Sequence, residues 1–132
     1  MNGYHQNLGG LALENTDYRH VLYTAEQMQL VLMHLKPNES IEQESHEMID
    51  QFFYVVQGFG LAIINGIENP IESGDCILIP QKAKHEIINI SNNLDLKLFT
   101  IYSPPQHRDG LIRKTKKEAE RFEMAYDNKT TE

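Results

Sequence analysis

The sequence predicts one all-β domain, a sandwich or barrel, followed by a short C-terminal α-helix. First, residues 28–102 consist of short apolar runs separated by turn residues at fairly regular spacing, which is typical of such a fold. Second, a helical spacing of apolar residues begins only after Thr115. Third, a chain of 132 residues can bury a sizeable core, and its single cysteine, Cys76, cannot form an intrachain disulfide.

Each apolar run has the length of one strand. Asn65-Gly66 gives the strongest turn signal, because a two-residue type I′ hairpin needs a positive φ at both positions. It predicts antiparallel pairing of the runs on either side. The predicted strands cover residues 28–35, 41–46, 51–57, 61–64, 76–80, 85–90 and 94–102.

The chain divides into three parts. Residues 1–27 are expected to form an N-terminal segment that packs on the barrel or swaps with it, residues 28–102 the barrel, and residues 103–132 a proline-rich loop and the helix. Within the first part, the first ten residues should be loose, whereas residues 11–23 should add an edge strand or two.

The end of the chain contains a loop and then a helix. Residues 103–110 hold too many helix and strand breakers to form either, which predicts an ordered loop. Thr115 and Glu118 have the spacing of a capping box, in which each side chain binds a free backbone amide of the first turn. Residues 127–132 are expected to fray. The apolar side chains of the helix share one face, which should dock on the barrel: Ala119, Phe122 and Tyr126.

The runs 28–35 and 94–102 are apolar on both faces. One face of an antiparallel sandwich normally meets water, so these strands need a second cover. The C-terminal helix, the N-terminal segment or another subunit could supply it, and we favour a homodimer.

The charge balance argues against nucleic acid as a partner. The formal charge is −7, and the one basic cluster, residues 113–117, runs into acidic residues. No apolar run approaches the roughly 20 residues that span a bilayer, and the N-terminus does not resemble a signal peptide. These features predict a cytoplasmic protein that does not bind a membrane.

Four residues could hold a metal ion. Glu44 and His46 are two apart, so both side chains leave the same face of a strand. Gln51 opens the next strand after a short turn, and His85 opens another, so the four could converge inside a barrel. Two imidazoles and one carboxylate form the donor set of a facial triad, to which Gln51 would add a neutral oxygen. Fe(II), Mn(II), Ni(II) and Zn(II) all suit such a divalent metal site.

A substrate pocket would lie beside this site. Residues an even number of positions from a candidate ligand on the same strand share its face, so they would line the cavity. Phe52 and Tyr54 would face the other way. The expected lining residues are Phe53, Val55, Ile87 and Asn89.

These residues resemble the two motifs of the cupin superfamily. In the first motif, Asn38 stands for a glycine, Glu44 for the first histidine and Gln51 for a glutamate, whereas His46 and Gly58 are retained. In the second motif, Gly74, Pro80, His85 and Asn89 fit, and Lys82 replaces a glycine. The resemblance implies a double-stranded β-helix, the jelly-roll barrel of cupins, with metal ligands at Glu44, His46, Gln51 and His85.

The flanks also resemble a group of small single-domain cupins that is loosely described as similar to mannose-6-phosphate isomerase. Glu44-Ser45-His46, Asp50-Gln51-Phe52 and the run from Tyr102 to Pro105 carry this likeness. It implies a metal-dependent, isomerase-like enzyme acting on a small sugar or sugar-like hydroxycarbonyl metabolite.

Three functions stay open at this point. In an isomerase, the metal would act as a Lewis acid, and Glu44 or a bound water would move the proton. With iron, the same triad could instead support an oxygenase acting on a small organic substrate. A small-molecule-binding module without catalysis is the third alternative.

Other histidines are assigned structural roles. His34 lies on an apolar strand and is expected to be packed or hydrogen-bonded, whereas His107 is expected to be exposed in its loop.

Overall fold

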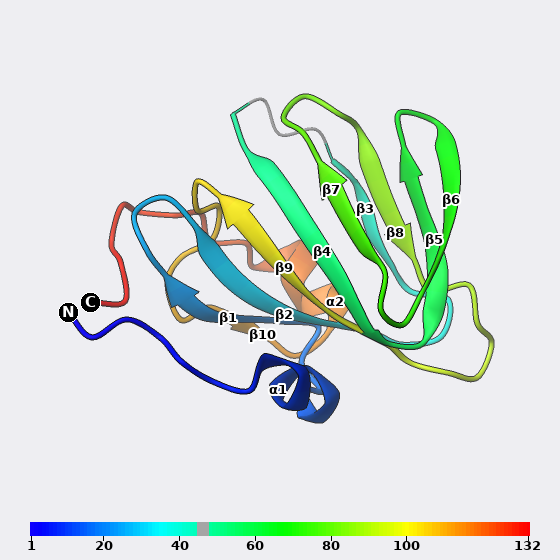
Figure 1. Cartoon of the computed structure of the whole chain (residues 1–132), viewed down its shortest axis with the longest axis horizontal. Helices are drawn as coiled ribbons and strands as arrows, with labels where there is room; N and C mark the ends of the chain where they lie inside the picture. The colour runs from blue at the N-terminus through cyan, green and yellow to red at the C-terminus, as the bar shows by residue number, and fades with distance from the viewer. Residues whose placement is uncertain (45–47) are drawn as a thin grey trace.

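The computed structural model describes residues 1–44 and 48–132, with the backbone alone considered at positions 43 and 44. Within this range the chain forms a six-stranded sheet of order β10-β1-β2-β9-β4-β7 and a four-stranded sheet of order β3-β8-β5-β6, all pairs antiparallel (Figure 1). The predicted all-β class with a C-terminal helix is confirmed. The strands are β1 Arg19–Thr24, β2 Gln29–Leu35, β3 Ser40–Glu44, β4 Asp50–Gln57, β5 Phe59–Ile64, β6 Ile67–Glu72, β7 Cys76–Ile79, β8 His85–Ile88, β9 Leu96–Ser103 and β10 Ile112–Arg113, and the helices are α1 Leu8–Glu14 and α2 Lys116–Arg121.

The core lies between the two sheets and follows the period-two alternation of the strands. In β4, Gln51, Phe53 and Val55 are buried, whereas Phe52 and Tyr54 are only half-buried on the outer face. The phase predicted for this strand is therefore correct, and a shift by one residue would have put every one of these side chains on the wrong face.

The hairpin between β5 and β6 turns at Asn65-Gly66, as predicted. Their φ angles are 49° and 82°, and Ile64 pairs with Ile67 across the turn. At the two positions where the motif resemblance expects a glycine, the backbone also has a positive φ, of 67° at Asn38 and 75° at Lys82. Both residues therefore adopt the left-handed conformation that glycine adopts readily.

The N-terminal segment is more ordered than the sequence predicts. The first ten residues were expected to be loose, yet α1 begins at Leu8, where the side chain of Asn7 accepts a hydrogen bond from the amide of Gly10 at 3.0 Å. Gly9 and Gly10 lower the helix propensity, but Ala12 is fully buried and α1 packs against β2, β4 and β9. Tertiary packing therefore overrides propensity here. The N-terminal segment does add a strand, β1, but β10 pairs with its outer side and forms the edge of the sheet.

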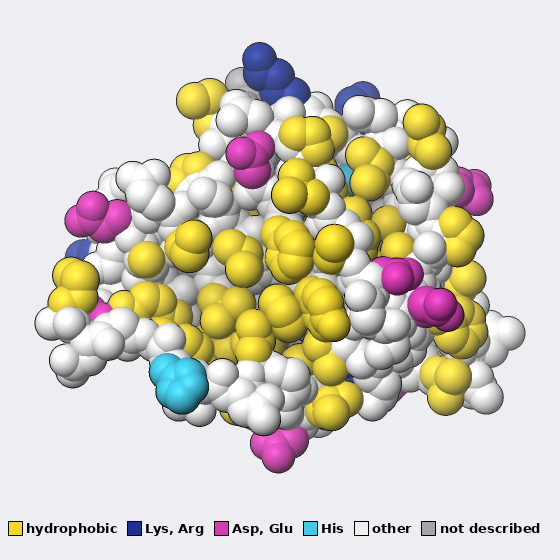
Figure 2. All heavy atoms as spheres, viewed as in Figure 1, with side chains coloured by type: hydrophobic (Ala, Val, Ile, Leu, Met, Phe, Trp, Pro, Cys, Tyr) yellow, Lys and Arg dark blue, Asp and Glu magenta, His cyan; other side chains and the backbone are white. Residues whose placement is uncertain are grey.

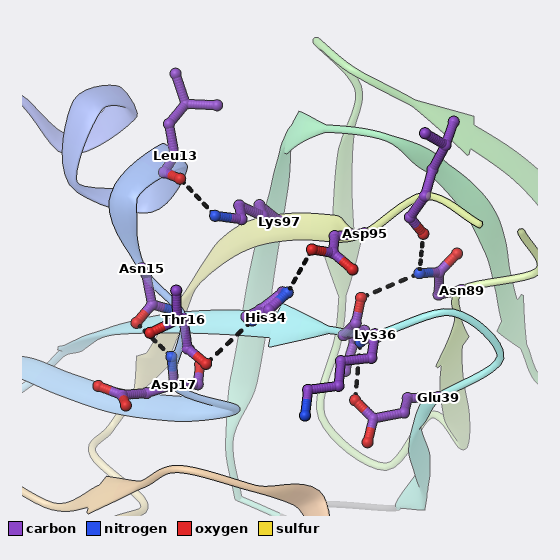
Figure 3. A network of polar contacts seen from close by, with 12 residues as sticks. Leu13, Asn15, Thr16, Asp17, His34, Lys36, Glu39, Asn89, Asp95 and Lys97 are labelled. Atoms are coloured by element: carbon purple, nitrogen blue, oxygen red, sulfur yellow. Dashed lines mark hydrogen bonds and ion pairs between the residues drawn. The ribbon is translucent and has the colours of Figure 1, made fainter.

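Polar contacts also hold this segment to the barrel (Figure 3). The ring of His34 bridges two of its neighbours: Nδ1 lies 3.1 Å from the carbonyl oxygen of Thr16, and Nε2 lies 3.1 Å from a carboxylate oxygen of Asp95. Lys97 donates to the carbonyl of Leu13 in the last turn of α1. The prediction that His34 is packed or hydrogen-bonded is confirmed.

The C-terminal helix begins as predicted but ends early. Thr115 accepts a hydrogen bond from the amide of Glu118 at 3.1 Å, and Ala119 is buried. The helix stops at Arg121, so Phe122 leaves the predicted docking face and is exposed. The prediction for Phe122 is therefore wrong, because a helical spacing has no meaning beyond the last turn.

The expected fraying of residues 127–132 is also wrong. The amide of Thr131 donates to the carbonyl of Thr24 at 2.9 Å, and the side chain of Glu132 accepts from the amides of Asn2 and Gly3. Long-range hydrogen bonds therefore fix the tail beside β1, and the two ends of the chain lie side by side (Figure 1).

The outer face of the six-stranded sheet carries two cross-strand apolar rows, which we call the outer apolar face. The register aligns Leu30, Ile101, Phe52 and Leu78 in one row, and Leu32, Phe99, Tyr54 and Cys76 in the other, in which Leu32 is already buried within the chain. The rings of Tyr54 and Phe99 stack with centroids 5.2 Å apart. Figure 2 shows hydrophobic side chains gathered on this side of the molecule. No described helix is long and apolar enough to cross a membrane.

Candidate functional site

Buried polar side chains gather at one end of the barrel. Because β2, β9 and β4 are antiparallel neighbours, the start of β2, the end of β9 and the start of β4 lie at the same end of the sheet (Figure 1). Gln29, Tyr102 and Gln51 are register partners across these strands, and all three are buried. We call this group the polar end; it comprises Gln29, Gln51, His85, Thr100, Tyr102 and His107.

Gln51 presents an oxygen atom to the barrel interior. Its side chain is 2% exposed, and its amide nitrogen Nε2 donates to the hydroxyl of Thr100 at 3.0 Å. The other amide atom, Oε1, is buried and has no hydrogen-bond partner among the described residues. A buried carbonyl oxygen normally has a partner. This oxygen therefore suits a ligand that the protein itself does not supply, such as a metal ion.

His85 lies on the opposite sheet and is also fully buried. Its ring centroid is 6.1 Å from that of Phe53, the next inward residue after Gln51 on β4, and the two rings meet edge to face. Neutral imidazole and amide oxygen both suit a first-row divalent metal, so these two residues fit such an ion.

The other two candidate ligands come from β3 and the segment after it. The backbone of Glu44 is the register partner of His85, whereas His46 lies outside the described residues, as does the side chain of Glu44. Among the described residues, no three His, Cys, Asp or Glu side chains form a group that could hold a metal. The four-ligand set is thus described for Gln51 and His85 only.

The expected pocket residues divide into two kinds. Phe53, Val55 and Ile87 point inward and belong to the hydrophobic core. Asn89 lies at the opposite end of the barrel from His85, where its Nδ2 donates to the carbonyls of Leu35 at 3.0 Å and Leu94 at 2.8 Å (Figure 3). The polar atoms of Asn89 therefore bind the backbone.

His107 was expected to be exposed, and this prediction is wrong. Its ring is buried and meets Tyr102 edge to face, with Nε2 3.2 Å from the phenol oxygen. Gln29 holds it there: its Oε1 accepts from the amide of His107 at 2.9 Å, and its Nε2 donates to the carbonyl of the same residue at 2.7 Å. The side-chain amide of Gln29 thus forms two hydrogen bonds with the backbone of His107, as a neighbouring strand does in a sheet. These bonds hold the loop against the polar end.

Sequence reasoning did not single out Gln29, Thr100 or Tyr102 as parts of this region. Each is in phase with buried apolar neighbours on its strand, as Gln29 is with Val31 and Met33. A polar residue at an inward position of an apolar strand is the signal that could have identified them.

A scan against protein families matches residues 31–102 to the model described as a cupin domain. Among curated proteins, L612 of Acanthamoeba polyphaga mimivirus is 41% identical over 112 residues, which is 83% of this chain and 70% of that protein. YrkC of Bacillus subtilis is 31% identical over 119 residues, or 86% of this chain. Only 63% of YrkC is covered, and both relatives are described as uncharacterized.

The crystal structure of BH2720 from Bacillus halodurans has a similar fold along nearly the whole chain. The two align with a TM-score of 0.88 at 31% identity, over 92% of this chain and 96% of that one. The likeness therefore includes the flanking segments as well as the barrel.

Proposed function

This chain belongs to the cupin family, and on that premise we propose that it is a small metal-binding cupin. The proposed ligands are Glu44, His46, Gln51 and His85. The observation that carries the proposal is the buried Oε1 of Gln51, which has no partner among the described residues while Thr100 holds the amide nitrogen. Thr100 thereby presents the oxygen, rather than the nitrogen, as the free atom of the amide.

The proposed reaction is the isomerisation of a small sugar or sugar-like hydroxycarbonyl compound. A divalent Fe, Mn, Ni or Zn ion would supply Lewis acidity, which lowers the cost of removing a proton next to a carbonyl. Glu44 or a bound water would move that proton between adjacent carbons. The likeness to the group described as similar to mannose-6-phosphate isomerase supports this substrate class.

The described residues would contribute a dry and rigid surrounding. Phe53 packs against His85 and limits the freedom of its ring, while Thr100 fixes the side-chain amide of Gln51. Side chains held in this way keep a ligand geometry ready without reorganisation when the metal binds.

Elemental analysis of untagged protein tests the metal site. We expect about one equivalent of a first-row divalent metal per chain, and much less in His85→Ala and Gln51→Ala. His20→Ala is the matched control, because His20 is only partly buried on β1 and its Nδ1 lies 3.3 Å from a carboxylate oxygen of Asp17. Equal metal content in the His85 and His20 variants would disprove the proposed ligand set.

Incubation of the metal-loaded protein with dihydroxyacetone in D₂O tests the reaction. An isomerase-like site should exchange the hydrogens next to the carbonyl for deuterium, as NMR would show. Oxygen consumption with Fe(II) and no deuterium exchange would favour the dioxygenase alternative. Binding of the ligand without either signal would favour the non-catalytic binding module.

We also propose that a second copy of the chain covers the outer apolar face. Its two rows are uncharged, so two copies can meet there about a two-fold axis despite a formal charge of −7 on each. Leu78, at the end of one row, is 66% exposed.

Leu78→Lys should convert a dimer to a monomer in light scattering. Ile67→Lys, at an equally exposed position on the β5–β6 hairpin, should leave the dimer intact, and a monomeric wild type would refute the proposal.

A further inference from the structure

Arg19, at the start of β1, is a buried cation. Its side chain is 7% exposed, and its Nε is buried without a hydrogen-bond partner. In the part of the chain that the structure describes, Arg19 forms no ion pair, and its guanidinium carbon lies over the ring of Tyr18, 5.5 Å from the ring centroid. A guanidinium keeps its charge in a protein, and a buried charge without a counter-charge is costly.

A pocket of about 100 Å³ opens beside this guanidinium. It lies where β1 of the six-stranded sheet and β3, an edge strand of the four-stranded sheet, meet α2, and the hydroxyl of Tyr18 donates to the carbonyl of Ser40 between the two sheets. The volume is several times that of a water molecule and suits a ligand of a few heavy atoms. The polar side chains that line it are Tyr18, Arg19, Glu42, Lys116, Glu120 and Glu123.

The charges of this pocket are arranged by depth. Arg19 is deepest, whereas Glu120 and Glu123 are exposed at the rim. Lys116 is already neutralised, since its Nζ lies 2.6 Å from a carboxylate oxygen of Glu42. Arg113 is the register partner of Arg19 and adds a second positive charge nearby, with its own Nε donating to the carbonyl of Phe122. The interior therefore attracts an anion, and the rim attracts a cation.

We infer that this pocket binds a small zwitterion of the α-amino acid class. Its carboxylate would bind the guanidinium of Arg19, a pairing for which the planar fork of arginine is suited. Its ammonium group would lie at the rim near Glu120 and Glu123. A simple anion lacks this second contact and meets two rim carboxylates, so it is disfavoured. This inference does not depend on the proposed metal site.

NMR titration of the Arg19 Nε–H signal tests the inference, with glycine, acetate and inorganic phosphate as probes. Glycine should shift the signal, and acetate should bind about three- to fivefold more weakly, since a charged contact at the exposed rim is worth roughly that factor. Arg19→Met should abolish glycine binding. Arg121→Met is the matched control, because Arg121 also lies over an aromatic ring, that of Phe122, and should bind glycine as the wild type does.

A second variant separates the two ends of the ligand and remains informative if Arg19→Met does not fold. In the double variant Glu120→Gln, Glu123→Gln, glycine should bind only as tightly as acetate. Glycine binding that is unchanged in this variant would overturn the inference, as would the absence of any glycine-induced shift in the wild type. Phosphate or acetate binding as tight as that of glycine would also overturn it.

Discussion

Two buried amides at opposite ends of the barrel have opposite hydrogen-bond states. At the polar end, Gln51 uses one amide atom to bind Thr100 and leaves Oε1 without a partner among the described residues. At the other end, the Nδ2 of Asn89 donates to two backbone carbonyls, and its Oδ1 accepts from the amide of Ser91 at 3.0 Å. The amide of Asn89 therefore stabilises the fold, whereas that of Gln51 retains binding capacity. The comparison teaches that burial alone does not distinguish a structural amide from one with a free acceptor, whereas the hydrogen-bond state of its atoms does.

Alanine substitution at the two positions should separate these roles most strongly. Asn89→Ala removes three hydrogen bonds, those to the carbonyls of Leu35 and Leu94 and the one from the amide of Ser91, so we expect it to lower the free energy of unfolding by about 3 kcal/mol. Gln51→Ala should cost only about 1 kcal/mol, because it removes a single hydrogen bond, yet it should weaken metal binding. Urea denaturation measures the first effect and metal titration the second.

The exposed Asn69 provides a control for this pair. Its Nδ2 donates to the carbonyl of Ala62 at 3.3 Å on the surface of the four-stranded sheet, so Asn69→Ala should change stability by less than about 0.5 kcal/mol. Equal destabilisation by the Asn89 and Gln51 substitutions would mean that both amides are structural.

Thr100→Val should sharpen the interpretation of the polar end. The substitution keeps the shape of the side chain but removes the acceptor that fixes the amide of Gln51, so the amide can turn its nitrogen inward. We expect the dissociation constant for the metal to rise about tenfold, as is typical when a residue that orients a ligand is lost. Thr100→Ser retains the hydroxyl and should bind metal as the wild type does. If Val and Ser behave alike, Thr100 does not orient the ligand.

A smaller effect is expected from backbone conformation at the two ends. Lys82 precedes His85 at the polar end and has a φ of 75°, which costs a residue with a Cβ about 1 kcal/mol. Lys82→Gly should therefore raise the midpoint of urea unfolding. Asn38→Gly, at a φ of 67°, should have little effect, because asparagine tolerates this region. A lower midpoint for Lys82→Gly would show that its side chain contributes more than the strain costs.

The smallest effect should come from the C-terminal tail. The tail belongs to neither end of the barrel, so it serves as a reference for the effects expected there. The hydrogen bond from Tyr23, followed by the one from the amide of Asn2, lowers the pKa of Glu132. Because the folded pKa lies below the unfolded one, this contribution is present above the unfolded pKa and is lost as the pH falls through the folded value. Thermal melts of Glu132→Gln should therefore approach those of the wild type as the pH is lowered. A constant difference at every pH would assign the effect to packing.

The fold could be predicted because it rests on local patterns. Period-two alternation placed Gln51, Phe53 and His85 on the inner faces, and Asn65-Gly66 specified its own turn. Helix α1 was not predicted because Gly9 and Gly10 lower the helix propensity of this segment, and tertiary packing stabilises the helix instead. The two-residue strand β10 is too short to leave a pattern.

The site could be predicted only in part, for a different physical reason. His85 and Gln51 stood out through motif spacing, but His107 was assigned to the surface because loops are usually exposed. Its burial depends on Gln29, which no local pattern connects to it. A contact between a side chain and a distant loop is specified by the whole fold and not by the neighbouring sequence.

The clamp between Gln29 and His107 also bears on the order of folding. It joins residues 78 positions apart, so closing it early would cost a large loop entropy for two hydrogen bonds. The β5–β6 hairpin closes through a two-residue turn and carries almost no such cost. We therefore expect the β5–β6 hairpin to form early and the loop that contains His107 to dock last. The barrel would then be folded before the polar end is complete.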